Sequence, residues 1–194
     1  MAEGFFRRAW RLIQLNRSHV IARRYFVVNG FDGALTMLGL LLGFSFSTPS
    51  EPAVVLAACL GAAIALAMSG FSSAYISESA ERQLEFRQLQ NSMISDLRDS
   101  AHARASRWSP VLIAAVNSLS PLLMSLLIML PLWLTERGYA LPFEPLLAGI
   151  TIAFGLIFLL GAFLGVISGT FWLWSGLKTL AVATITTLAI YAFV

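Results

Sequence analysis

The chain has 194 residues, of which 58% are hydrophobic and only 12% are charged. An average soluble domain carries roughly 25% charged residues, so this composition excludes an ordinary water-soluble protein and favours a membrane protein. The single cysteine, Cys59, excludes an intramolecular disulfide framework and any metal site built from several cysteines. The net charge of +3 comes from arginines that flank apolar segments, and no basic patch interleaved with aromatic residues indicates nucleic-acid binding.

Residues 1–24 form a basic N-terminal arm with six arginines. Phe6, Trp10 and Ile13 recur between the arginines at helical steps, which is typical of an amphipathic helix on an anionic membrane surface. The arm lacks the apolar core of a secretory signal, and we expect it to stay in the mature chain; the alternative is a transit peptide.

Five apolar segments follow, each close to the roughly 20 residues that cross the hydrocarbon core of a bilayer. They are Tyr25–Ser47, Ala53–Ser77, Pro110–Thr135, Leu146–Ile167 and Gly176–Val194. The sequence therefore predicts an all-α, polytopic membrane protein, with two transmembrane helices in residues 25–77 and three in residues 110–194. Arginines are concentrated in residues 1–24 and 78–109, so the positive-inside rule predicts a cytoplasmic N-terminus.

The first span contains a carboxylate, Asp32, and an ionisable residue inside a membrane is a functional candidate by default. Polar and small residues share a helical stripe with it, at steps of three and four: Asn29, Asp32, Thr36, Gly39 and Gly43. The two glycines form a G-x-x-x-G pair, which lets transmembrane backbones pack closely, so we expect this stripe to face protein. The alternative is that Asp32 is a structural residue, hydrogen-bonded to Asn29, Thr36 or a neighbouring helix.

Other residues of the spans support a packed bundle. Met37 and Met68 are soft ligands that suit a late transition metal, although methionine in a transmembrane helix is usually a packing residue. The third span contains Asn117 and two prolines that can kink a helix, with or without a role in transport. Small residues at four-residue spacing predict close helix packing in the second span (Ala57, Gly61, Ala65) and the fourth (Gly161, Gly165, Gly169).

Residues 78–109 are the long polar segment, and no Gly or Pro separates it from the second span. We therefore expect the second helix to continue into the cytoplasm, and Ser109-Pro110 to begin the third span. Glu78, Glu81 and Glu85 share one face of this helix. They form either a row that collects metal cations or a salt-bridged surface, because Arg82 is within helical ion-pair reach of two of them.

Enzyme chemistry is not indicated. An intramembrane aspartyl protease needs two carboxylates inside the spans, and only Asp32 qualifies. The apolar segments also lack a Ser-His pair and a His-Glu zinc motif, so no catalytic residue and no permanently bound cofactor is predicted.

Four runs, in this order, resemble the vacuolar iron transporter family. They are F-D-G-A-L-T-x-L-G-x-x-x-G at Phe31–Gly43, A-x-x-M-S-G-x-S-S-A-Y-I-S-E at Ala65–Glu78, the S-P at Ser109-Pro110, and S-G-L-K-T-L at Ser175–Leu180. The resemblance implies a homodimer that exports Fe²⁺ or Mn²⁺ from the cytoplasm in exchange for protons, between the first two spans of each subunit.

The resemblance assigns the family's first-span aspartate to Asp32. The family's second-span methionine and glutamate positions correspond here to Gly70 and Ala74, with Met68 two residues out of register, which indicates a divergent, prokaryotic-type member. The predicted transport path comprises Asp32, Thr36, Met37, Asn29 and Met68, and the predicted capture row is Glu78, Glu81 and Glu85.

The expected partners are divalent metal ions, the lipid bilayer and a second copy of the chain, in the cell membrane if the protein is prokaryotic. The metal is cargo and not a resident cofactor. The rival interpretation is a non-transporting membrane scaffold or regulatory subunit, in which the glycine stripes serve assembly alone.

Overall fold

The computed structural model describes residues 18–46, 51–93 and 101–193, and within these ranges it contains five helices and no strand. The helices are α2 (Ser18–Phe46), α3 (Pro52–Met93), α4 (Ala101–Glu136), α5 (Pro145–Ser168) and α6 (Trp172–Phe193). Each is long and apolar enough to cross a membrane, which confirms the predicted all-α, five-span, multi-pass membrane protein. Most of the basic arm, residues 1–17, lies outside the described residues.

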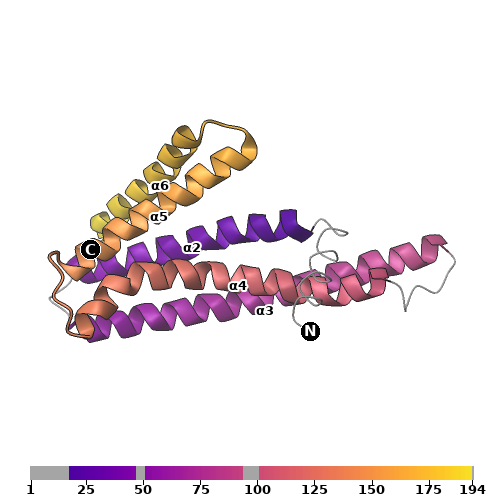
Figure 1. Cartoon of the computed structure of the whole chain (residues 1–194), viewed down its shortest axis with the longest axis horizontal. Coiled ribbons are helices and arrows are strands. Elements are labelled where there is room, and N and C mark those ends of the chain that lie inside the picture. Colours follow the sequence, from indigo (N-terminus) through magenta and orange to yellow (C-terminus); the bar gives the residue numbers. More distant parts are fainter. Residues whose placement is uncertain (1–17, 47–50, 94–100, 194) are drawn as a thin grey trace.

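Two helices are much longer than a membrane span. α3 has 42 residues and α4 has 36, or about 63 and 54 Å at 1.5 Å per residue, against ~30 Å of hydrocarbon. They run antiparallel and project together past the end of α2 (Figure 1). As expected, α3 continues without a break into the polar segment.

The helix starts differ from those predicted. α4 begins at Ala101, not at Pro110, and contains Pro110, Pro121 and Pro131 in its interior. A proline removes one helical hydrogen bond, but packing along α3 holds α4 together across its prolines. Similarly, α2 begins at Ser18, so the described end of the basic arm is already part of the first spanning helix.

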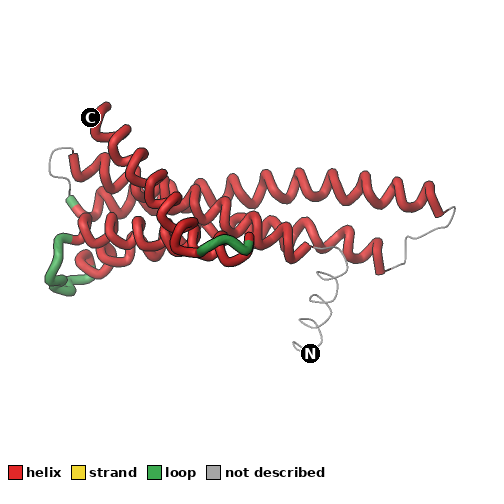
Figure 2. Tube along the Cα trace, turned by 90° about the horizontal axis from the view of Figure 1, so that it is seen from above, coloured by secondary structure: helices red, strands yellow, loops and turns green. Residues whose placement is uncertain are grey.

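Because α2 contacts all four other described helices, it is the central element of the bundle. Its buried face, which includes Ala34, Met37, Leu38 and Leu41, packs into one hydrophobic cluster with residues of α3 to α6. α5 and α6 form a hairpin that leans away from α2 toward the end at which α3 and α4 project (Figures 1 and 2).

The predicted small-residue stripes have different environments. A Cβ on Gly161 would lie 2.2 Å from Thr179 Oγ1, and one on Gly165 would lie 2.7 Å from Ser175 Cβ, so the glycines of α5 permit the close contact with α6. On α3, by contrast, Gly61 is exposed in the single chain, and an added Cβ would meet nothing within 4 Å.

Candidate functional site

Asp32 lies on the outward face of α2. Its side chain is exposed, whereas Gly33, Ala34 and Met37 are buried. At about 100° per residue, the other four members of the predicted stripe lie on the same side as Asp32, and each of them is half-buried. The structure therefore brings Asn29, Asp32 and Thr36 to one face of a membrane-spanning helix.

The stripe is only partly covered within one chain. A Cβ on Gly39 would lie 3.6 Å from Ile190 Cδ1 of α6, so α6 crosses the stripe at that level. At Gly43, an added Cβ would meet no atom within 4 Å outside the helix's own backbone. Asp32 has no ion-pair partner in the part of the chain that the structure describes. Since a carboxylate is costly in hydrocarbon, this face needs water, a cation or another protein surface against it.

Asn29 belongs to a polar junction of three helices. Its Nδ2 donates to the Tyr25 carbonyl at 2.9 Å and to Oδ1 of Asn117 on α4. Asn117 Nδ2 in turn donates to the carbonyl of Gly70 on α3 at 2.6 Å. Because both amide hydrogens of Asn29 are used, its Oδ1 is the group that it can offer to a cation, and amide oxygens are suitable ligands for divalent ions.

The same junction explains the glycine at position 70. A Cβ there would lie 3.2 Å from Asn117 Nδ2 and 3.3 Å from the Asn117 backbone oxygen. That oxygen has no helical N–H partner, because the residue four positions later is Pro121. Asn117 thus occupies the space that a methionine side chain at position 70 would take. Ala74, which the resemblance aligns with the family's glutamate, is also buried.

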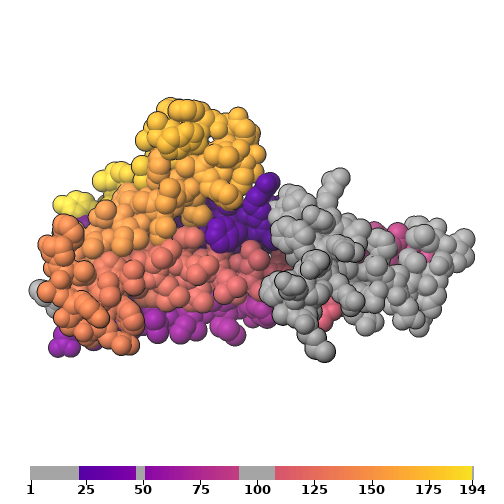
Figure 3. Space-filling model, in the orientation of Figure 1, coloured from indigo at the N-terminus to yellow at the C-terminus, as the bar shows by residue number. Residues whose placement is uncertain are grey.

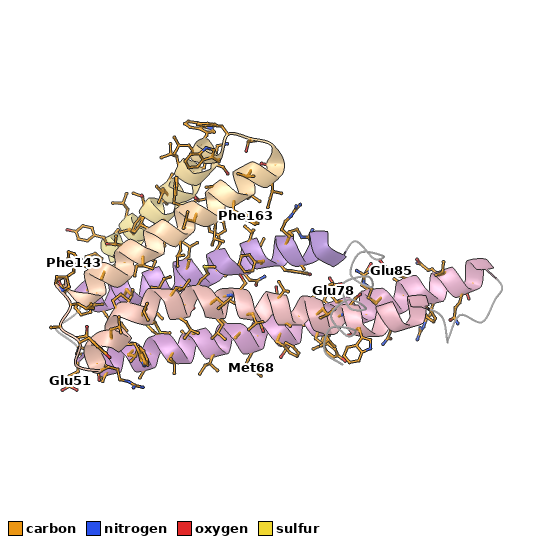
Figure 4. All side chains as sticks on the ribbon, in the orientation of Figure 1. Glu51, Met68, Glu78, Glu85, Phe143 and Phe163 are labelled. Atoms are coloured by element: carbon orange, nitrogen blue, oxygen red, sulfur yellow. The ribbon has the colours of Figure 1, made fainter. Side chains whose placement is uncertain are left out.

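The two candidate methionines are not on the Asp32 face. Met37 is fully buried in the hydrophobic cluster, about 140° around α2 from Asp32. Met68 is 61% exposed, and Figure 4 shows it on the side of α3 that points away from α4. In this conformation the candidate ligands that come together are therefore oxygen groups.

We call the predicted capture row of Glu78, Glu81 and Glu85 the acidic row. Within it, Arg82 forms ion pairs with Glu78 and Glu85. Arg82 Nη1 lies 2.7 Å from Glu85 Oε2, and Nη2 lies 3.7 Å from Glu78 Oε2. The Tyr25 hydroxyl donates to Glu78 Oε1 at 3.5 Å and so links the start of α2 to α3. Glu78 and Arg82 are buried, while Glu81 is exposed. Glu78 lies on α3 beside the first part of α2, and Glu85 lies farther along α3, toward its projecting end (Figure 4).

This geometry agrees with the salt-bridge interpretation for Glu78 and Glu85. Among the described residues, no group of three or more His, Cys, Asp and Glu side chains is arranged to hold a metal ion. Metal capture by the row would therefore require Arg82 to release its carboxylates, and Glu81 is an exposed member that takes no part in these two ion pairs.

The structure gives three residues of this region roles that the sequence did not predict: Asn117, Tyr25 and Gly33. The bridge between Asn29 and Asn117 joins positions 88 apart, so no local pattern reveals it. In the sequence Tyr25 marks only the start of the first span, and its hydrogen bond to Glu78 was not predicted. Gly33 follows Asp32, and a Cβ on it would lie 2.6 Å from Pro121 Cα; the Asp-Gly pair was the available signal for this close approach.

Two comparisons with known proteins identify the family of the chain. Residues 23–94, which contain Asp32 and the whole acidic row, match the VIT family. The uncharacterized protein MJ0645 of Methanocaldococcus jannaschii is 31% identical over 161 residues, which cover 81% of this chain and 81% of the archaeal protein. Members of the matched family are membrane transporters, not enzymes. The chain thus belongs to the VIT family, the vacuolar iron transporters, and is a multi-pass membrane protein of a metal-ion transporter family.

Proposed function

We propose that this protein exports Fe²⁺ or Mn²⁺ from the cytoplasm in exchange for protons, as a homodimer in the cell membrane. The observation that carries the proposal is the position of Asp32, a carboxylate on the open face of a membrane-spanning helix. Its oxygen atoms can hold a divalent ion that has lost part of its water, with Asn29 and Thr36 on the same face as further oxygen ligands. The same carboxylate can take a proton after the ion leaves, which couples the two without a second site.

A second copy of the chain would complete this site. Two-fold symmetry brings the same surface of both subunits together, so an interface through α2 would place the two Asp32 faces opposite each other. Such an arrangement would remove the carboxylates from lipid and enclose a path between them. Met37 and Met68 do not lie on the Asp32 face in the conformation described, and their part in transport rests on the softness of the thioether as a ligand for late transition metals.

The direction of transport rests on the predicted orientation. The arginines near the start of α2 and in the projecting ends of α3 and α4 favour a cytoplasmic location for that end of the bundle. The acidic row on α3 would then meet ions before they reach the spans.

The test is metal flux into proteoliposomes that contain a metal-sensitive dye. The wild-type protein should carry Fe²⁺ or Mn²⁺ at a rate that depends on the pH difference across the membrane. Asp32→Asn keeps the size of the side chain but cannot neutralise the ion or exchange a proton, so its flux should equal that of empty liposomes. Glu51→Gln removes an exposed carboxylate at the opposite end of the first two spans and should transport like wild type.

Two results would overturn the proposal in different ways. Wild-type flux in the Asp32→Asn variant would make Asp32 a structural residue. Absence of divalent flux in the wild-type protein would favour the scaffold or regulatory subunit, for which the exposed small-residue stripe of α3 offers a surface for assembly.

A further inference from the structure

A cavity of about 310 Å³ lies between the first turns of α2 and the last turns of α5. Its lining residues are Arg23, Arg24, Val27, Val28, Phe31, Leu164 and Ile167. The cavity is situated where the α5–α6 hairpin diverges from α2 (Figure 1), and in the space-filling view the first turns of α2 reach the surface beside this hairpin (Figure 3).

The lining combines a cationic edge with an apolar wall. Arg23 and Arg24 are exposed, the other five lining residues are aliphatic or aromatic, and no carboxylate contributes to the lining. The Arg24 guanidinium lies 5.7 Å from the centroid of the Tyr25 ring, and this cation-π contact favours its position beside the cavity. Arginine guanidinium groups bind phosphate through paired hydrogen bonds.

The cavity lies at the boundary of the membrane. The span in α2 begins at Ala22 and the span in α5 ends at Ser168, so both arginines lie within the first residues of one span and near the end of another. Charged groups at this level meet lipid headgroups, while Val28, Phe31 and Leu164 lie deeper, at the level of acyl chains.

We propose that this cavity binds an anionic phospholipid, with its phosphate at Arg23 and Arg24 and an acyl chain along Val28, Phe31 and Leu164. A zwitterionic lipid offers the same chain but places a cation near the two arginines. A free phosphate would leave the apolar wall in water. The chain's own residues 1–17 are less suitable, because they carry four further arginines. The proposal does not depend on the transported ion.

The test measures lipid binding to the full chain in detergent by native mass spectrometry, with phosphatidylglycerol and phosphatidylcholine as probes. Phosphatidylglycerol should bind more tightly. Arg23→Gln with Arg24→Gln should weaken its binding about 30-fold, the value for two basic residues near an anionic headgroup. The matched control, Arg87→Gln with Lys178→Gln, removes two exposed charges that do not line the cavity and should bind like wild type.

A second variant tests the apolar wall. Val28→Trp fills the cavity but keeps both arginines, and it should also lose the lipid, while each variant keeps wild-type helical content by circular dichroism. A photo-cross-linker at position 28 should label phosphatidylglycerol. Equal binding of the two lipids, equal weakening in the control pair, or full binding by Val28→Trp would overturn the proposal. Cross-linking to residues 1–17 or to a second chain would do so as well, by identifying a different occupant.

Discussion

Asp32 and Gly33 are adjacent in sequence and have opposite environments. The Asp32 side chain is exposed on the outer face of α2, while Gly33 is buried where α2 crosses the backbone of α4 at Pro121. Helical geometry separates consecutive side chains by about 100°, so one short motif can serve a polar face and a packed one. The glycine fixes how closely α2 approaches α4, and thereby the position of Asp32 relative to the rest of the bundle.

Gly33→Ala should lower stability by ~1–3 kcal/mol, the usual cost of excess volume in a packed core. The added Cβ would lie 2.6 Å from Pro121 Cα and 2.7 Å from Pro121 O, which are backbone atoms that cannot rotate away. Thermal unfolding in detergent measures the change. Gly61→Ala is the matched control, since its Cβ would meet nothing within 4 Å and alanine favours the helix. Equal stability of the Gly33 and Gly61 variants would contradict this account.

Residue-level prediction succeeded where the signal was local. The stripe through Asp32 follows from helical spacing, and the ion pairs of Arg82 follow from steps of three and four. The two methionines were chosen for the chemistry of their sulfur, although helical spacing already puts Met37 about 140° from Asp32, and the structure buries it in the core. The sequence offers no reason for a glycine at position 70. The structure supplies one, because Asn117 of α4 donates a hydrogen bond to the Gly70 carbonyl of α3, and a contact between two helices leaves no local pattern.

At the scale of elements, length and hydropathy predicted the five spanning helices, because a bilayer requires about 20 apolar residues in each. The start of α4 was not predictable in this way. The rule that a helix begins near a proline is local, whereas α4 starts nine residues before Pro110 and runs antiparallel to the neighbouring helix α3. The hairpin of α3 and α4 is therefore a tertiary feature that hydropathy could not show.

The acidic row on α3 leads to a prediction about metal capture. Three glutamates and Arg82 give the row a net charge of −3 + 1 = −2, and Arg82 competes with metal for two of the carboxylates. If the row collects cations, exchanging Glu78, Glu81 and Glu85 together for Gln should weaken Mn²⁺ binding in isothermal titration, and Arg82→Gln should strengthen it. A loss of structure would weaken Mn²⁺ binding in both variants, whereas metal capture predicts weaker binding in one and stronger binding in the other. Unchanged affinity in both variants would show that the row is only a salt-bridged surface.

At the scale of the whole molecule, two surfaces of small residues have room for a further side chain. One is the half-buried end of the Asp32 stripe at Gly43, and the other is the exposed α3 stripe centred on Gly61. α6 approaches the stripe at Gly39, where an added Cβ would lie 3.6 Å from Ile190 Cδ1, and the centroid of its Tyr191 ring lies 5.5 Å from that of the Phe46 ring near the end of α2. A homodimer could use either surface, but only an interface through α2 brings two Asp32 side chains toward a shared axis.

We expect the dimer to form through α2, and a pair of leucine substitutions can test this. Gly43→Leu adds bulk where the partner's backbone should approach, so it should weaken the dimer; overpacking of this kind typically costs ~1–3 kcal/mol, or a factor of about 5 to 150 in the dissociation constant. Gly61→Leu adds the same bulk on α3 and should leave dimerisation unchanged. Position 39 is a poorer probe, because a side chain there would first meet Ile190 of the same chain. Analytical ultracentrifugation in detergent gives the dissociation constants of both variants and of the wild-type protein. A dimer that is weakened by Gly61→Leu and not by Gly43→Leu would move the interface to α3, and would leave Asp32 facing lipid with no partner from a second subunit.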